Sequence, residues 1–288
     1  DRLHRPTRIP VRPSGSGQAH SNAPDSRDGN GLEEDVAKPT KPPRRKVVDL
    51  LNEMQSTEVI RSLRFSHVML NTTTRCQSRC LYCFEGDRSL HRDLEPDTVR
   101  GLLEGMVGKV PSVVFMGAEP TMNPDIVELV QHASNLGYVP VISTNALRFS
   151  DPAFLQRCVD AGLIGLEVSF PYPDAATYAR ITQTGPAGYG KLLQAVRNIN
   201  EVNRKHPGPR YDNQALGINI NIVVSRFNYH RLPEILDTVN ELLADSPVVA
   251  TVKMIAPSSN EPAYIEKFLR EFFVPLQTLR HVFGSLLR

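Results

Sequence analysis

The chain has 288 residues, of which 40% are apolar, so it holds enough hydrophobic side chains for a core. Its 33 Lys and Arg nearly balance its 31 Asp and Glu, leaving a net charge of +2. This balance argues against a dedicated nucleic-acid partner, which carries a concentrated basic face. No apolar run reaches the roughly 18 residues of a membrane span, and the N-terminus lacks the apolar segment of a secretory signal. We therefore expect a cytoplasmic protein without a membrane partner.

The first part of the chain has the composition of a tail. Residues 1–45 are rich in Pro, Ser, Gly, Asp and Arg. They contain few of the large apolar side chains that offset the entropy lost on ordering, so the sequence predicts disorder over 1–45. The pattern changes at Lys46, where apolar residues between Val47 and Met54 predict a short amphipathic helix.

Strand and helix patterns then alternate. Six apolar runs read as strands, at His67–Asn71, Ser112–Met116, Val139–Ser143, Ile164–Phe170, Gly217–Val224 and Thr251–Ile255. Helical patterns follow at Glu95–Gly108, Pro124–Leu136, Asp151–Ala161, Gly188–Lys205 and His230–Leu243. Strands and helices that alternate in this way predict a parallel sheet with right-handed crossovers. Because a closed TIM barrel needs eight units, we predict an α/β fold with a partial (β/α)6 TIM-like barrel over 46–257.

The last residues carry a further helical stripe. Apolar side chains recur at helical spacing from Ile265 to Leu286, so 258–288 is predicted to be a C-terminal helical extension. Pro275 lies inside the stripe and is expected to kink or divide it, because proline lacks the backbone N–H that a helix interior uses.

Three of the four cysteines fall within eight positions, at Cys76, Cys80 and Cys83, directly after the first predicted strand. Clustered thiols in a large chain with few cysteines indicate a metal site in a reducing compartment. Structural zinc takes four protein ligands, and the nearest candidates for a fourth, His67 and His91, have no recognised finger spacing. A three-thiolate set suits a [4Fe–4S] cluster with one open iron, while zinc and plain structural thiols remain the alternatives.

The pattern C-x3-C-x2-C, with the aromatic Tyr82 before its last cysteine, resembles the hallmark of the radical S-adenosylmethionine (SAM) superfamily. The motif style most resembles the branch of peptide-modifying and sulfatase-maturing enzymes. After the second predicted strand, Gly117, Ala118, Glu119 and Pro120 are similar to the family's Gly-Gly-Glu-Pro segment, which lines the methionine amino group of SAM. Ala118 replaces the second glycine, and the backbone contact is kept if the φ of Ala118 is negative.

The resemblance extends to the ends of the later strands. Ser143 and Asn145 are similar to the family's Ser/Thr-x-Asn turn near the cofactor. Ser169 stands where relatives contact the SAM carboxylate or ribose, Asn221 falls on the strand that borders the adenosine, and Ile255 ends the strand beside the adenine. Each lies near the carboxyl end of a predicted strand, on the face that carries the active site of a barrel.

One position departs from the family pattern. Many relatives carry an arginine after the fourth strand that pairs with the SAM carboxylate, whereas Thr182 occupies the aligned place here. Arg180 lies two positions earlier. Either Arg180 reaches the carboxylate from there, or it is an ordinary solvated arginine at a helix end.

The resemblance implies an enzyme in which the clustered cysteines hold a [4Fe–4S] cluster that binds SAM. Reductive cleavage of SAM would give a 5′-deoxyadenosyl radical, which abstracts hydrogen from a peptide or another natural-product precursor. An electron donor such as a flavodoxin or a ferredoxin is the implied partner. A radical SAM enzyme acting on tRNA is the alternative within the family, although the near-neutral charge argues against RNA. A non-catalytic zinc- or cluster-binding interaction module is the alternative in a different class.

Overall fold

The computed structural model describes residues 66–83, 91–205, 216–246, 248–254 and 262–286. The chain divides into two units, Asp1–Met54 and Gln55–Arg288, and all of the described residues belong to the second. The tail predicted over 1–45, the helix predicted between Val47 and Met54, and Ile255 lie outside the described residues. The domain boundaries drawn from the sequence therefore stay predictions.

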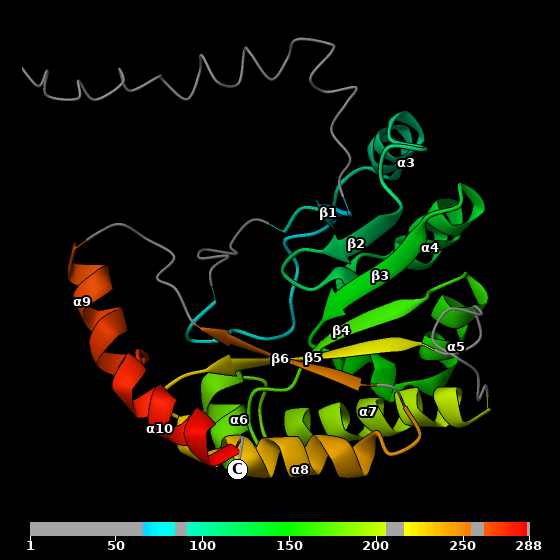
Figure 1. The fold of residues 1–288 in the computed structure, drawn as a ribbon. Coiled ribbons are helices and arrows are strands. Elements are labelled where there is room, and N and C mark those ends of the chain that lie inside the picture. Colours follow the sequence, from blue (N-terminus) through cyan, green and yellow to red (C-terminus); the bar gives the residue numbers. More distant parts are fainter. Residues whose placement is uncertain (1–65, 84–90, 206–215, 247, 255–261, 287–288) are drawn as a thin grey trace, which may run out of the picture. The chain divides into compact units, whose positions relative to one another are not determined.

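Six parallel strands form one sheet in which the spatial order follows the chain order (Figure 1). The strands are β1 (Val68–Asn71), β2 (Ser112–Met116), β3 (Val139–Thr144), β4 (Gly165–Ser169), β5 (Gly217–Val224) and β6 (Val248–Met254). Helices connect successive strands along the outer side of the curved sheet, as right-handed crossovers require. The predicted α/β class and the six-unit parallel order are confirmed.

The helices begin and end close to their sequence signals. The described helices are α3 (Pro96–Gly105), α4 (Ile126–Asn135), α5 (Pro152–Asp160), α6 (Ala175–Thr182), α7 (Ala187–Lys205), α8 (Leu232–Leu242), α9 (Pro262–Glu271) and α10 (Leu276–Leu286), with 3-10 turns η1 (Pro120–Met122), η2 (Leu147–Ser150) and η3 (Tyr229–Arg231). For example, α5 starts at a proline, and the Asp151 carboxylate caps it by accepting a hydrogen bond of 2.9 Å from the Ala153 N–H. The C-terminal stripe is divided around Pro275, as predicted.

Three elements differ from the sequence prediction by three residues or more, and one of them is α3, which ends at Gly105 rather than at Gly108. Helix α6 was not predicted, and it is set by Asp174, whose carboxylate accepts a hydrogen bond of 2.8 Å from the Thr177 N–H at the helix start. Strand β6 begins at Val248 rather than at Thr251, because β5 supplies pairing partners from Ile218 onward.

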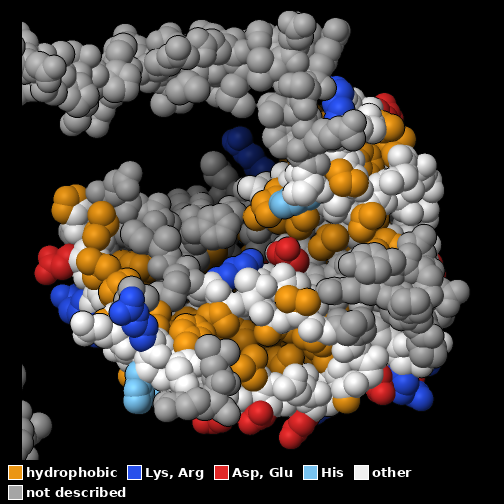
Figure 2. Space-filling view, in the orientation of Figure 1, with side chains coloured by type: hydrophobic (Ala, Val, Ile, Leu, Met, Phe, Trp, Pro, Cys, Tyr) orange, Lys and Arg blue, Asp and Glu red, His pale blue; other side chains and the backbone are white. Residues whose placement is uncertain are grey.

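The surface of the described residues carries charge of both signs. On the face drawn in Figure 2, the Lys and Arg side chains stand apart from one another and do not form a continuous basic patch. None of the described helices is both long enough and apolar enough to cross a membrane.

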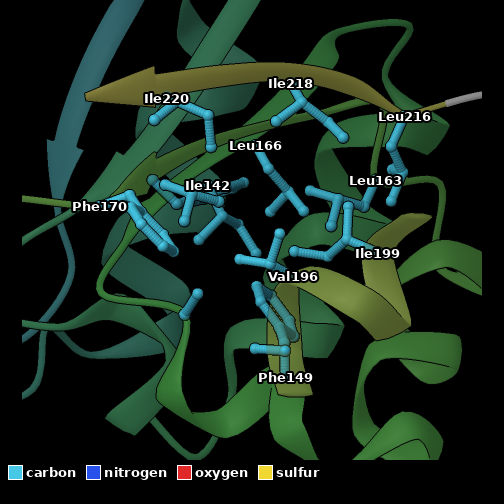
Figure 3. Packing of buried hydrophobic residues seen from close by; sticks show 14 of the residues in the cluster. Ile142, Phe149, Leu163, Leu166, Phe170, Val196, Ile199, Leu216, Ile218 and Ile220 are labelled. Carbon is cyan, nitrogen blue, oxygen red and sulfur yellow. The ribbon is translucent and has the colours of Figure 1, made fainter. Parts of the chain in front are cut away.

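The hydrophobic core lies between the sheet and the helices on its outer side (Figure 3). Ile142 on β3, Leu166 on β4 and Ile218 on β5 are at most 1% exposed and point toward α7. Val196 and Ile199 of α7 meet them from the other side of this layer. Burial of each such side chain contributes about 1.5–3 kcal/mol, which fixes one face of these strands against the helix. The intervening strand residues therefore point to the opposite, inner face of the sheet.

Candidate functional site

The three clustered cysteines lie on a loop that starts directly after β1. The base of this loop is closed where the chain returns to it, since the Leu94 N–H donates to the Thr72 carbonyl over 2.9 Å. The Thr73 hydroxyl donates to the Asp93 carboxylate over 2.6 Å, and the Arg75 guanidinium pairs with the same carboxylate at 2.9 Å. Both ends of the loop are thus fixed to each other beside the carboxyl end of β1.

The middle of the cysteine loop is anchored to helix α6. The Arg79 N–H donates to the Thr182 carbonyl over 2.8 Å, and the Leu81 N–H donates to the Ile181 carbonyl over 3.0 Å. A short turn brings the Cys83 N–H to the Cys80 carbonyl at 3.1 Å. The carbonyls at the end of α6, which have no partner within the helix, are therefore used to hold the loop.

The cysteine environments separate into two kinds. Cys76, Cys80 and Cys83 are partly exposed, whereas Cys158 is buried on α5, where burial raises the pKa of its thiol to about 12. A metal ligand must be a thiolate, so Cys158 is unsuited to this role. Within the described ranges, no three His, Cys, Asp or Glu side chains converge on one point that would suit a single metal ion. Thiolates bind both zinc and iron–sulfur clusters, and three partly exposed thiols on one loop fit the three-thiolate cluster that the sequence predicts.

The Glu119 carboxylate joins the ends of β2 and β3. It is 1% exposed, and its Oε1 accepts hydrogen bonds from the Thr121 N–H at 3.1 Å and from the Thr121 and Thr144 hydroxyls at 2.6 Å each. Its Oε2 accepts one from the Asn145 N–H at 2.7 Å. Burial raises the pKa of Glu119, although these hydrogen bonds act in the opposite direction. With this one hydrogen bond from the described residues, Oε2 has a further lone pair. That lone pair can accept a hydrogen bond from a cationic amino group.

The segment before Glu119 approaches the cysteine loop closely. Gly117 has a φ of +142°, and a Cβ there would lie 2.5 Å from the Thr73 carbonyl oxygen, so only glycine fits. The next N–H, that of Ala118, donates to the same carbonyl over 3.0 Å. Ala118 is not among the residues of positive φ, so its replacement of the family's second glycine is accommodated without strain. Pro120 follows as a buried first residue of η1.

The inner face of the sheet is polar near the carboxyl ends of β3, β4 and β5. In the strand register Ser143 lies opposite Glu167, and Ser169 lies opposite Asn221. The Asn221 amide donates to the Glu167 carboxylate over 3.4 Å. The alternation of strand side chains thus places the predicted Ser143, Ser169 and Asn221 on one surface, opposite the apolar residues that contact α7.

Three of the buried polar atoms around this surface have no hydrogen-bond partner within the described part of the chain, namely Gln77 Oε1, Asn221 Oδ1 and Tyr172 Oη. Tyr172 is fully buried, and its burial raises the pKa of its phenol. The Tyr82 and Ser225 hydroxyls lie near it without hydrogen-bonding geometry. Because an unsatisfied buried polar atom costs about 1–3 kcal/mol, these atoms fit a polar ligand on this surface, such as SAM.

The Arg180 side chain lies on the surface, over an aromatic ring. It is exposed on α6, and its guanidinium carbon lies 5.1 Å from the centre of the Phe227 ring. Its contact with the SAM carboxylate stays a prediction.

An aromatic residue of the C-terminal extension reaches the cysteine motif. Phe272, 6% exposed, packs edge-on against Tyr82 with a centroid distance of 6.4 Å and against Phe227 at 5.8 Å. Burial beside Tyr172 and Cys80 raises the pKa of Tyr82. The sequence pattern placed Phe272 in an apolar stripe but carried no signal for this contact.

Partly exposed thiols on an anchored loop, at the carboxyl end of a parallel sheet and beside a polar inner surface, define an iron–sulfur enzyme built on a partial barrel. The chain belongs to the radical SAM superfamily, whose family model matches residues 70–239. Membership implies a [4Fe–4S] cluster and SAM as its cofactors.

Individual relatives agree with this placement. The chain is 32% identical to the PqqA peptide cyclase of Rhodopseudomonas palustris over 191 residues, which are 65% of this chain and 46% of that protein. It is 30% identical to the PqqA peptide cyclase of Xanthomonas euvesicatoria over 186 residues, 64% of this chain and 46% of that protein. The crystal structure of Streptococcus suis SuiB has a similar fold, with a TM-score of 0.58 at 17% identity over 84% of this chain and 50% of that one. The chain thus spans about half the length of these relatives.

Proposed function

We propose that this radical SAM enzyme abstracts hydrogen from a peptide or another natural-product precursor. The observation that carries the choice of substrate is the similarity to the PqqA peptide cyclases at 32% identity. The reaction type rests on family membership together with the anchored loop of three partly exposed thiols. Held by Cys76, Cys80 and Cys83, a [4Fe–4S] cluster together with SAM would supply the radical chemistry that removes a hydrogen atom from the substrate.

In this proposal the cysteine loop holds the cluster. Cys76, Cys80 and Cys83 would each bind one iron as thiolates and leave one iron open for SAM. The backbone bonds of the loop to α6 and to residues 92–94 keep these thiols in place before the metal arrives. Cys158 takes no part, because its thiol is buried and keeps its proton at neutral pH.

The carboxyl ends of β2 to β6 would orient SAM. The Glu119 carboxylate has hydrogen-bonding capacity for the amino group, and the close approach of Gly117 to Thr73 brings the neighbouring backbone to the same side. The remaining residues proposed to contact SAM are Tyr82, Ala118, Pro120, Ser143, Asn145, Ser169, Arg180, Asn221 and Ile255. The unsatisfied Asn221 Oδ1 and Tyr172 Oη support a polar ligand there.

An electron must reach the cluster from outside the protein, and a flavodoxin or a ferredoxin is the proposed donor. The protein's own contribution to this step is the accessibility of the loop. All three thiols are partly exposed, and the neighbouring Leu81 is exposed, at 45%.

The test is an anaerobic assay of SAM cleavage. The protein is reconstituted with iron and sulfide and reduced with dithionite, and 5′-deoxyadenosine is measured by mass spectrometry with SAM alone and with candidate precursor peptides. We expect the product with the wild type, more of it with a substrate peptide, and none with a variant in which Cys76, Cys80 and Cys83 are Ala. Stimulation by tRNA in place of peptides would contradict the proposed substrate, and zinc without iron in the purified chain would contradict the proposed chemistry.

A further inference from the structure

We propose that Asn145 adjusts the reduction potential of the cluster by donating a hydrogen bond to the Cys76 sulfur. The inference rests on the proposed function, because it takes Cys76 as a cluster ligand. It goes beyond the SAM contact that the family resemblance implies for Asn145, since the amide here points to a ligand of the metal.

Among the described residues, a backbone and a side-chain nitrogen donate to the Cys76 sulfur. The Ser78 N–H donates to it from 3.3 Å, and the Asn145 side-chain Nδ2 donates to it from 3.7 Å, within the range of hydrogen bonds to sulfur. The first donor belongs to the loop's own backbone. The second is a side-chain amide from the end of β3, so substitution of Asn145 removes it.

The orientation of the Asn145 amide is determined by its neighbours. The Leu147 N–H donates to Asn145 Oδ1 over 3.1 Å, and a backbone N–H can only donate. The oxygen of the amide must therefore face Leu147, which leaves the nitrogen to face the sulfur. Gln77 Nε2 donates to the same oxygen over 3.1 Å and further polarises the amide toward Cys76.

The position of Asn145 is held as firmly as its orientation. Its own N–H is bound by the buried Glu119 carboxylate at 2.7 Å. The next residue, Ala146, adopts a left-handed conformation with a φ of +62°, and its N–H donates to the Thr144 hydroxyl over 2.8 Å. A non-glycine residue in this region of backbone conformation is uncommon and indicates that the turn is fixed by its surroundings.

A hydrogen bond to a ligand sulfur favours the reduced cluster, which carries more negative charge. Hydrogen bonds to the sulfurs are among the factors that set the potentials of iron–sulfur proteins. Loss of the Asn145 bond is therefore expected to lower the potential. Since the effect acts on the cluster itself, it is expected in the absence of SAM and of substrate.

The experiment compares the cluster midpoint potential of the wild type with that of Asn145→Leu and Asn145→Asp, measured by redox titration followed by electron paramagnetic resonance without SAM. Leu removes the donor. Asp keeps the acceptor for Leu147 but turns an oxygen toward the sulfur and adds negative charge. At the wild-type midpoint, we expect the ratio of reduced to oxidised cluster to fall about tenfold in Asn145→Leu, or about 59 mV for a one-electron couple. The fall is expected to be larger in Asn145→Asp.

Asn198→Asp on α7 is the matched control, since this half-buried amide donates to the Phe149 and Ser150 carbonyls at 2.9 and 3.1 Å. We expect it to leave the potential unchanged. Iron and sulfide content verifies loading in every variant. Unchanged potentials in both loaded Asn145 variants overturn the inference and leave the proposed function standing. Failure of both to hold a cluster that Asn198→Asp retains also overturns it, because Asn145 would then build the site rather than adjust it. A wild type that takes up no cluster contradicts the proposed function itself.

Discussion

Replacement of Glu119 by Gln tests whether a buried carboxylate ties the ends of β2 and β3 together. In the wild type, Oε1 accepts hydrogen bonds from the Thr121 N–H and from two threonine hydroxyls, and Oε2 accepts one from the Asn145 N–H. A glutamine side chain has a single acceptor oxygen. In either orientation of its amide, the N–H of Thr121 or that of Asn145 therefore faces an NH2 group.

The magnitude follows from these contacts. A buried donor left without an acceptor costs about 1–3 kcal/mol. Part of this cost is offset, because the variant no longer has to remove a carboxylate from water, which is what raises the pKa of Glu119. We expect a net loss of about 2 kcal/mol in the free energy of unfolding at pH 7. For a domain of this size, that loss lowers the Tm by about 4–8 °C.

The loss is expected to depend on pH. Because the pKa of Glu119 is raised in the folded chain, its contribution to stability is fully present below the unfolded value of about 4.3 and declines as the pH rises through the folded value. Glutamine does not titrate. The difference in Tm between the wild type and Glu119→Gln is therefore larger at pH 5 than at pH 8.

Scanning calorimetry of the reconstituted protein at the two pH values measures this difference. Glu128→Gln serves as the control, because Glu128 is exposed on α4 and pairs with Arg100 at the surface, where an ion pair contributes about 0–1 kcal/mol. If Glu119→Gln has the same Tm as this control, the carboxylate does not tie the two strand ends together as described. If its deficit instead grows with pH, the hydrogen bonds outweigh burial and the pKa of Glu119 is not raised.

Three further predictions concern the C-terminal extension and the cysteines. Phe272→Ala removes a buried ring at a cost of about 3–5 kcal/mol. We expect the substitution to speed up hydrogen exchange in α9 more than in the strands. Unchanged exchange in α9 would contradict the packing described. Cys158, with a pKa of about 12, is expected to resist iodoacetamide at pH 8 in the folded metal-free chain, while the three partly exposed thiols react. A fourth adduct that forms without denaturant would argue against the burial of Cys158. Cys80→Ala is expected to lose iron and SAM cleavage and to keep its far-ultraviolet circular dichroism, and normal SAM cleavage by this variant would refute the cluster assignment.

Much of the fold is predictable because each strand is a short apolar run and most helices carry a cap residue or a proline at their start. Helix α6 escapes prediction because its eight residues bury only Tyr178 and Ile181 as apolar side chains, too few to establish a helical period. The start of β6 depends on pairing with β5, which no local pattern records. A tertiary partner, rather than propensity, therefore determines where β6 begins.

The candidate site divides in the same way. Its cysteines, Glu119 and the polar strand ends are visible in the sequence because each belongs to a short motif. The contacts between motifs are not visible, because they join residues that are far apart in the sequence. Gln77 and Asn145 are 68 positions apart, and Phe272, which contacts Tyr82, belongs to the C-terminal extension. The hydrogen-bonding environment of the Cys76 sulfur therefore emerges only from the folded chain.

The anchorage of the cysteine loop to α6 has a consequence for how this protein can evolve. The bonds at positions 79 and 81 use only backbone N–H groups, while the side chains of Arg79 and Leu81 are exposed. Almost any residue except proline can form the same two bonds. Mutation can therefore exchange charge for apolar surface right beside the cysteines without loosening them. The backbone of the loop can therefore stay the same while the side chains at positions 79 and 81 vary. Related proteins can in this way change the surface that a partner contacts beside the cysteines and keep the same chemistry at the cysteines.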